Sequence, residues 1–241
     1  LKNLSAHFNI MADKLQEQME EIRRNERECQ QMEKKLLQSQ INPHFLYNTL
    51  DSIIWMIRSE EYEGAGKMVS LLAKFFRISL SQGKDMIPLE KELEHASSYL
   101  AIQNIRFKDK FEFQIEADPA LLKYLCPKLS IQPLLENAIY HGMEGMYEDG
   151  EITIRIYDRD GDIGIDVADN GPGLTQETID HIMHNKVISS KRGSGIGVRN
   201  VNERIQLIYG EDYGVTITSE LDEGTTATIT ITKMEETDDA R

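Results

Sequence analysis

Three groups of polar and glycine residues follow one another in the second half of the chain. Asn137 and His141 lie four residues apart in a helical-looking run, Asp169 begins the stretch Asp-Asn-Gly-Pro-Gly, and glycines alternate with other residues over 193–197. An asparagine and a histidine at this spacing share one face of a helix and can hold a divalent metal ion or phosphate oxygens. An aspartate at the end of a strand can accept a hydrogen bond from an exocyclic amine such as that of adenine.

The two glycine stretches complete this pattern, because glycines let backbone N–H groups approach phosphates. Taken singly, residues 169–173 are more typical of an ordinary turn, and residues 193–197 are as typical of a loop that enters a helix. The three groups in this order predict a nucleotide-binding pocket.

A second cluster lies far upstream, in the stretch Asn-Pro-His-Phe-Leu-Tyr-Asn at residues 42–48. His44 is a candidate nucleophile, because a neutral imidazole nitrogen is an effective acceptor near pH 7. The alternative is a structural histidine that is buried at a helix bend. Asn48 and Asp51 follow one and two turns later on the same face. Asn48 cannot act as a base but can position the ring or a water molecule, whereas Asp51 is a candidate acid or base.

These motifs, taken together over about residues 36–232, resemble the sensor histidine kinases of the LytS/YesM type. The resemblance implies that His44 accepts the phosphoryl group and that the later boxes form the ATP-binding domain shared with gyrase, Hsp90 chaperones and MutL. It also implies ATP and Mg²⁺ as cofactors, and a response regulator whose receiver-domain aspartate takes the phosphoryl group.

The same resemblance implies a role for each pocket residue. Asn137 would be the Mg²⁺ ligand, and His141 would point at metal or phosphate oxygens. Asp169 would bind the adenine amino group, while Gly171 and Gly173 would shape the pocket beneath the base.

The third group would contact the phosphates. By the resemblance, Gly193, Gly195 and Gly197 would begin a helix whose free N–H groups face them. The polar segment just before this group is predicted to be a mobile lid from which Lys191 and Arg192 reach phosphate; the alternative is a solvated charged loop.

Two positions depart from better-known relatives. Many histidine kinases carry an acidic residue directly after the phosphoacceptor, where this chain has Phe45, so the base is Asp51, Glu136 or unassigned. ATP-hydrolysing relatives carry a water-activating glutamate four residues before the metal-binding asparagine, where this chain has Pro133. Pro133 therefore favours a kinase over the first alternative, a GHKL-type ATPase. A pseudokinase that serves as a signalling scaffold is the second alternative.

The composition excludes some classes of function. The chain has 241 residues and a formal net charge of −14, which argues against binding to nucleic acid or to an anionic membrane surface. Its two cysteines, Cys29 and Cys126, have neither metal-ligand nor disulfide spacing, which fits a reducing compartment. No run approaches the roughly 18 apolar residues of a membrane span.

The pattern of apolar residues predicts an α+β, multidomain chain. Residues 1–16 resemble the second helix of a HAMP module, which implies the cytoplasmic portion of a bacterial cell-membrane receptor that is anchored upstream of residue 1. Heptads over 17–40 predict a parallel coiled coil, and therefore a homodimer. Residues 41–108 are interpreted as dimerisation and phosphotransfer helices that form a dimeric helical bundle. Residues 109–234 are predicted to be an α/β sandwich ATP-binding (Bergerat-type) domain, and residues 235–241 a disordered acidic tail.

Within these domains, periodicity and turn residues predict individual elements. The expected helices cover 46–57, 65–80, 89–107, 129–141 and 198–209. The expected strands cover 111–116, 151–157, 163–167, 214–219 and 225–232.

Overall fold

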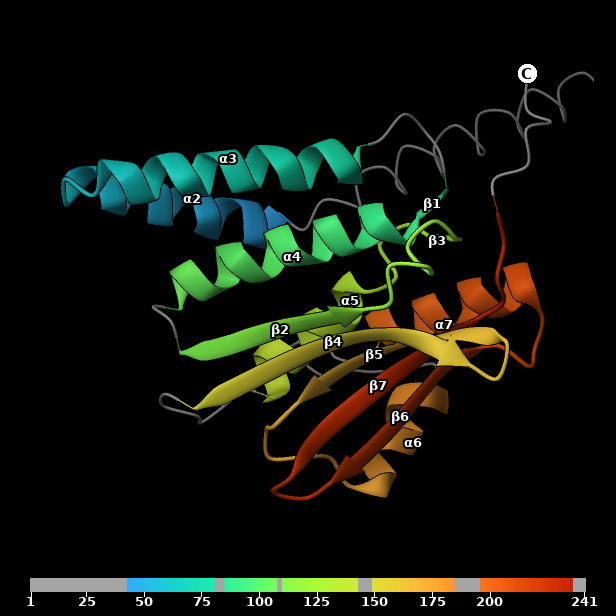
Figure 1. Ribbon diagram of the computed structural model, residues 1–241. Helices are drawn as coiled ribbons and strands as arrows, with labels where there is room; N and C mark the ends of the chain where they lie inside the picture. The colour runs from blue at the N-terminus through green and yellow to red at the C-terminus, as the bar shows by residue number, and fades with distance from the viewer. Residues whose placement is uncertain (1–42, 81–84, 108–109, 143–148, 185–195, 236–241) are drawn as a thin grey trace, which may run out of the picture. The chain divides into compact units, whose positions relative to one another are not determined.

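The computed structural model describes residues 43–80, 85–107, 110–142, 149–184 and 196–235 (Figure 1). The chain divides into two compact units, residues 1–48 and 49–241, and each is described by itself. The predicted HAMP-like helix, the coiled coil and all but the first residue of the acidic tail lie outside the described residues.

Among the described residues, three helices precede the main sheet. They are α2 (Pro43–Arg58), α3 (Tyr62–Ser79) and α4 (Leu89–Arg106). Helix α3 is amphipathic, because its buried apolar residues recur every three or four positions; they are Ala65, Met68, Leu72, Phe75 and Ile78. Helix α4 contacts α3 on one side and elements of the sheet domain on the other.

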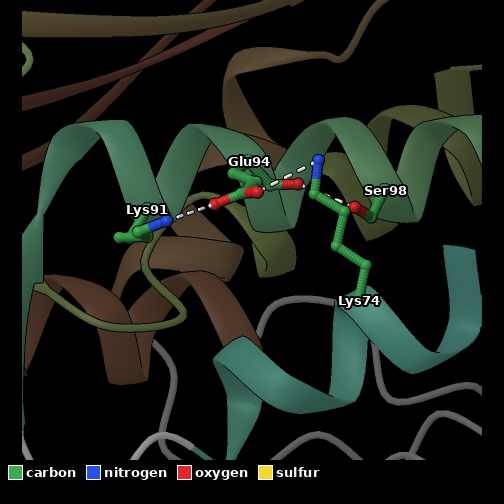
Figure 2. A network of polar contacts seen from close by, with 4 residues as sticks. All are labelled: Lys74, Lys91, Glu94 and Ser98. Atoms are coloured by element: carbon green, nitrogen blue, oxygen red, sulfur yellow. Dashed lines mark hydrogen bonds and ion pairs between the residues drawn. The ribbon is translucent and has the colours of Figure 1, made fainter.

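Polar contacts link α3 to α4 at their surface (Figure 2). The Glu94 carboxylate lies 3.1 Å from Nζ of Lys74 on α3 and 2.8 Å from Nζ of Lys91 on its own helix. Such partly exposed pairs contribute about 0–1 kcal/mol each, so apolar burial provides most of the contact between the two helices.

Deeper in the same interface, the His95 ring is stacked on Phe75 with 4.3 Å between ring centroids. Nε2 of His95 lies 2.8 Å from the Ser79 hydroxyl, and His95 is fully buried. Burial therefore lowers the pKa of His95 to about 4.

The main sheet has five strands in the order β2-β4-β5-β7-β6. They are β2 (Phe111–Ala117), β4 (Gly150–Arg159), β5 (Asp162–Asp169), β7 (Gly224–Ile231) and β6 (Gly214–Glu220). Strand β2 pairs with β4 in parallel, and the other pairs are antiparallel. A small antiparallel pair, β1 (Met86–Pro88) with β3 (Leu125–Pro127), joins the start of α4 to the segment before α5.

The two faces of the sheet differ in polarity. Cross-strand partners place Ile154, Val167 and Ala227 in one row of the inner face, and Ile156, Ile165 and Ile229 occupy the next row. This face is covered by α5 (Gln132–Asn137), η1 (Ala138–Gly142), α6 (Gln176–His184) and α7 (Ile196–Tyr209) (Figure 1). The outer face carries threonine, aspartate and arginine side chains, so the domain is a two-layer α/β sandwich.

Most predicted elements of the sheet domain are confirmed. The Asp160-Gly161 turn joins β4 to β5 with φ values of 54° and 98°, as expected of a two-residue hairpin turn. Strands β1 and β3 and helix α6 were not predicted from the sequence. The prediction of a continuous α-helix over 129–141 was wrong, because the α-helix covers only residues 132–137 and a π-helical turn follows.

None of the described helices is long and apolar enough to cross a lipid bilayer.

Candidate functional site

A cavity of about 300 Å³ lies between the inner face of the sheet and the helices that cover it. The sheet contributes Val167, Asp169, Ile217, Thr225 and Ala227, which belong to β5, β6 and β7. The helices contribute four apolar side chains, which are Leu134, Ala138, Ile182 and Val198, and four polar ones, which are Asn137, His141, Thr178 and His181. The cavity therefore combines apolar walls with a few polar groups, as expected of a site for a planar organic ligand.

Asp169 is the last residue of β5 and provides a carboxylate in this cavity. It lies on the inner face because it continues the alternating row of Ile165 and Val167. Burial raises the pKa of the carboxyl group to about 6, although hydrogen bonds from the backbone N–H groups of Gly171 and Thr225 act in the opposite direction. The Gly171 nitrogen lies 3.0 Å from Oδ1. A donor from a ligand would further stabilise the ionised form.

Asn137 and His141 line the same cavity. The change from α-helix to π-helix falls between them, because α5 ends at Asn137 and η1 covers Ala138–Gly142. Single π turns are frequent at functional sites. The predicted proximity of the two side chains to Asp169 is confirmed, since all three line the cavity.

Glycines allow η1 and the end of β5 to approach closely. A Cβ at Gly171 would lie 2.2 Å from the carbonyl oxygen of Gly142, and a Cβ at Gly142 would lie 2.6 Å from Cγ of Asp169. Gly173 has a φ of +72°, and a Cβ there would lie 2.1 Å from the Glu220 carbonyl oxygen. Gly173 lines the cavity, whereas Gly171 shapes it by contact with η1.

Helix α7 approaches α5 at its first residues. A Cβ at Gly197 would lie 3.1 Å from Cβ of Pro133, so a small residue at this position keeps the two helices close. Lys191, Arg192, Gly193 and Gly195 lie outside the described residues, as does the rest of the predicted lid after residue 184.

Sequence reasoning missed the contribution of α6. Thr178, His181 and Ile182 line the cavity, and so does Leu174 just before the helix. Helix α6 was not predicted because it is short and polar, but its apolar residues Ile179, Ile182 and Met183 recur at helical spacing. This spacing is the signal that points to the helix.

The second cluster lies on α2. His44 is exposed, and the amide nitrogen of Asn48 lies 3.0 Å from its Nε2 and 3.3 Å from its Nδ1. Phe45 is buried, and Asp51 is exposed on the same helix. An exposed His44 contradicts the alternative of a histidine that is buried at a helix bend.

Glu136, the other candidate base, does not line the cavity formed by the described residues. Its carboxylate oxygen Oε1 accepts a hydrogen bond from Nε2 of Gln132 at 2.9 Å. Glu136 and Asn137 therefore have different environments although they are neighbours in the sequence.

The residues of the cavity fit an adenine nucleotide with Mg²⁺. The half-buried Asp169 carboxylate offers an acceptor to an amine, and the apolar walls suit the faces of a base. In the part of the chain that the structure describes, no three His, Cys, Asp or Glu side chains are grouped as metal ligands. Mg²⁺ in nucleotide sites needs only one or two protein ligands in addition to phosphate oxygens, so Asn137 with a nucleotide would suffice.

Comparisons with known proteins agree with this geometry. The family described as "Histidine kinase" matches residues 32–111, and that described as "Histidine kinase-, DNA gyrase B-, and HSP90-like ATPase" matches residues 128–235. Sensor histidine kinase YesM of Bacillus subtilis is 38% identical over 228 residues, which are 95% of this chain and 38% of that protein. Sensor protein LytS of Bacillus cereus is 35% identical over 205 residues, which are 85% of this chain and 34% of that protein.

A solved structure described as a bacterial phosphotransferase has the same fold, with a TM-score of 0.50 at 15% sequence identity, over 80% of this chain and 94% of that one. The chain spans between a third and two fifths of the length of YesM and LytS. The two matched domains, their order and these relatives show that the chain belongs to the sensor histidine kinases of the LytS/YesM type.

Proposed function

We propose that the chain is the kinase portion of a two-component sensor histidine kinase, which transfers the γ-phosphoryl group of ATP to His44 and from there to an aspartate of a response regulator. The observation that carries this proposal is the cavity that brings together Asp169, Asn137 and His141. A carboxylate that can accept a hydrogen bond from an amine suits the base of an adenine nucleotide, and the amide and imidazole side chains suit its metal-bound phosphates.

Each cavity residue has a proposed role in binding. Asp169 accepts a hydrogen bond from the adenine amino group, and the apolar residues around it contact the base. Asn137 holds Mg²⁺, and His141 is directed at metal or phosphate oxygens. Bound Mg²⁺ neutralises charge on the phosphates and so lowers the barrier to transfer.

His44 is the proposed nucleophile. The lone pair of one ring nitrogen forms the N–P bond while the bond from the γ-phosphorus to the bridging oxygen breaks, and ADP leaves. The other ring nitrogen carries the N–H proton and loses it to a base, for which Asp51 is the candidate on α2. Asn48 positions the ring before transfer, because its amide can donate to the unprotonated ring nitrogen of His44, and this hydrogen bond is released when that lone pair attacks phosphorus.

The two alternatives make different demands on the site. A GHKL-type ATPase needs a base to activate water near Asn137, but Pro133 stands at the corresponding position and contacts Gly197. A pseudokinase scaffold would bind ATP without forming phosphohistidine. The exposed His44 beside Asn48 favours the kinase over both alternatives.

The proposed kinase works as a homodimer. Leu50, Ile54 and Ile57 of α2 are 41–48% exposed and recur at helical spacing, so they offer an apolar stripe to a second copy. By its family relation, the chain is the cytoplasmic portion of a bacterial cell-membrane receptor, with upstream HAMP-like and coiled-coil helices that carry the signal.

The test of the nucleotide site compares ATP with inosine triphosphate, which lacks the 6-amino group. Wild-type protein is expected to bind ATP at least about tenfold more tightly, because inosine triphosphate has a carbonyl oxygen in place of the amine and offers the Asp169 carboxylate no donor there. Asp169→Asn should remove most of this preference. Equal affinity of the wild type for both nucleotides would mean that Asp169 does not bind the 6-amino group of the base.

A further inference from the structure

Glu92 of α4 makes a set of contacts that the proposed mechanism does not use. It is fully buried, and its carboxylate accepts hydrogen bonds from the backbone N–H groups of Leu129, Ser130 and Ile131 at 2.9, 2.8 and 2.9 Å. These residues lie directly before α5, and Ile131 is its N-cap residue. A carboxyl group from another helix thus holds the segment that leads into the helix that carries Asn137.

Arg204 of α7 holds the same segment from its carbonyl side. Its Nη2 donates to the Leu129 carbonyl oxygen and to the Ser130 hydroxyl, at 3.2 Å each. Burial raises the pKa of Glu92, and the three backbone hydrogen bonds and the charge of Arg204 oppose this rise. We call residues 129–131 the clamped segment, because the buried carboxyl group of Glu92 and the partly buried guanidinium of Arg204 hold it between them.

The backbone of the clamped segment is itself unusual. Leu129 has a φ of 58°, in the left-handed region that residues with a Cβ rarely adopt. Such a conformation persists only where the surroundings fix it, and it is found preferentially at functional sites. Glu92 and Arg204 both bond to the backbone of Leu129, through its N–H and its carbonyl oxygen.

The clamped segment joins three helices that bear on the nucleotide site. Glu92 belongs to α4, Arg204 belongs to α7, and α5 begins directly after Ile131. Helix α7 also contacts α5 through Gly197 and Pro133. Well-packed apolar side chains would stabilise such a junction at least as well as buried charges do. Unlike apolar contacts, directional hydrogen bonds fix the orientation of α5.

We propose that Glu92 is a positioning residue: together with Arg204 it sets the orientation of α5 and η1, and thereby keeps Asn137 and His141 in place for metal and phosphate. Because Glu92 lies on α4, it also couples α4 to the nucleotide site. This proposal rests on the proposed function, since it assigns Asn137 and His141 to metal and phosphate.

The first experiment measures the coupling by hydrogen–deuterium exchange of the wild-type protein. Coupling between two sites is reciprocal, so a non-hydrolysable ATP analogue with Mg²⁺ should slow amide exchange in residues 89–93 as well as in 129–142. Adenosine, which does not reach the metal site, should leave 89–93 unchanged. Unchanged exchange in 89–93 with the analogue would overturn the coupling.

The second experiment compares Glu92→Gln with Glu94→Gln on the same helix. Glutamine preserves the shape of Glu92 but turns an amide NH₂ toward backbone donors. Within the described part of the chain, the Glu94 carboxylate contacts Lys74 and Lys91 at a partly exposed position, and its backbone carbonyl accepts a hydrogen bond from Ser98, so Glu94 controls for loss of a charge (Figure 2). For both variants, the affinity for the ATP analogue is measured with and without Mg²⁺, and the ratio gives the Mg²⁺-dependent gain. The affinity for adenosine and the kcat and KM of autophosphorylation are measured as well.

For Glu92→Gln the Mg²⁺-dependent gain and kcat should fall by about tenfold or more, as for other residues that orient metal ligands. Adenosine affinity should stay unchanged, and Glu94→Gln should behave as the wild type. An unaltered gain and kcat with only a lower melting temperature would make Glu92 purely structural. If Glu92→Gln does not fold, Glu92→Asp, which keeps the charge on a shorter side chain, is measured in the same way. The binding measurements need no phosphoryl transfer, so they remain decisive even if His44 is not phosphorylated.

Discussion

The amide nitrogen of Asn48 lies 3.0 Å from Nε2 and 3.3 Å from Nδ1 of His44, one helical turn earlier on α2. An amide at this distance restricts rotation of an exposed imidazole. The proposed nucleophile is therefore oriented by its own helix before any nucleotide arrives.

Removing this amide should slow the chemical step without weakening nucleotide binding. Asn48→Leu keeps the approximate size of the side chain and should lower autophosphorylation kcat by about tenfold, because orientation of reacting groups contributes strongly to such steps. The rate is measured at saturating ATP and Mg²⁺. An unchanged kcat would show that the contact has no part in the reaction.

The raised pKa of Asp169 predicts a dependence of binding on pH. Burial raises the pKa of the free carboxyl group to about 6, and the proposed hydrogen bond from adenine needs the ionised form. Binding must therefore weaken as pH falls below 6, and the dissociation constant for adenosine should rise about tenfold between pH 7 and pH 5. Adenosine is the probe because it carries no phosphate that titrates.

Asp169→Asn is the control for this prediction. His141 and His181 also line the cavity and remain in the variant, so any dependence that they cause persists there. The part of the pH dependence that is lost in Asp169→Asn belongs to the carboxylate. A wild-type affinity that is constant from pH 7 to pH 5 would contradict the role of Asp169.

Two substitutions of glycine by alanine should have opposite results. Gly171→Ala places a Cβ 2.2 Å from the Gly142 carbonyl oxygen, so η1 must shift away from β5. We expect the free energy of unfolding to fall by about 1–3 kcal/mol and most of the ATP binding to be lost. Gly66→Ala on α3 meets no atom within 4 Å and should increase stability by about 0.5–1 kcal/mol with ATP affinity intact. Denaturant unfolding and nucleotide titration check both variants, and normal ATP affinity in Gly171→Ala would be inconsistent with a close approach of η1 to β5.

Buried His95 predicts a contribution to acid sensitivity. Its pKa is about 4 in the folded chain and 6.5 in the absence of burial, so the folded state favours the neutral ring. The stability that this provides is complete above pH 6.5 and is lost as pH falls from 6.5 toward 4, by up to about 1.4 kcal/mol per pH unit. The free energy of unfolding of His95→Gln should therefore fall less steeply than that of the wild type between pH 6.5 and pH 5. Equal slopes would show that His95 is not protonated in this range on unfolding.

The sequence predicts the sheet domain well because alternation and turn residues are local signals. Asp160-Gly161 identifies a hairpin without knowledge of the rest of the fold, and the alternating residues before Asp169 place it on the inner face. The sequence also predicted correctly that Asn137, His141 and Asp169 lie in one pocket, because their order and spacing resemble those of a known nucleotide-binding family.

Helix α6 carries a local signal in its apolar spacing, but the other features that were missed depend on contacts between distant parts of the chain. The π-helical turn after Asn137 coincides with the close approach of Gly142 and Gly171, which no local pattern contains. In the sequence, Glu92 is one of several acidic residues of a predicted helix. Its role as a buried hydrogen-bond acceptor for residues 129–131 is visible only in the folded chain. The same holds for β1 and β3, which are three residues long and gain their partners only in the folded chain.

The most direct test of the account is whether His44 carries the phosphoryl group. Wild-type protein and His44→Gln are incubated with γ-labelled ATP and Mg²⁺, and the label on the protein is tested for stability in acid and in alkali. The account predicts a label on the wild type that is labile in acid and stable in alkali, and no label on His44→Gln although that variant still binds ATP. An acid-labile label that persists on His44→Gln, or ATP binding by the wild type without any label, would contradict it.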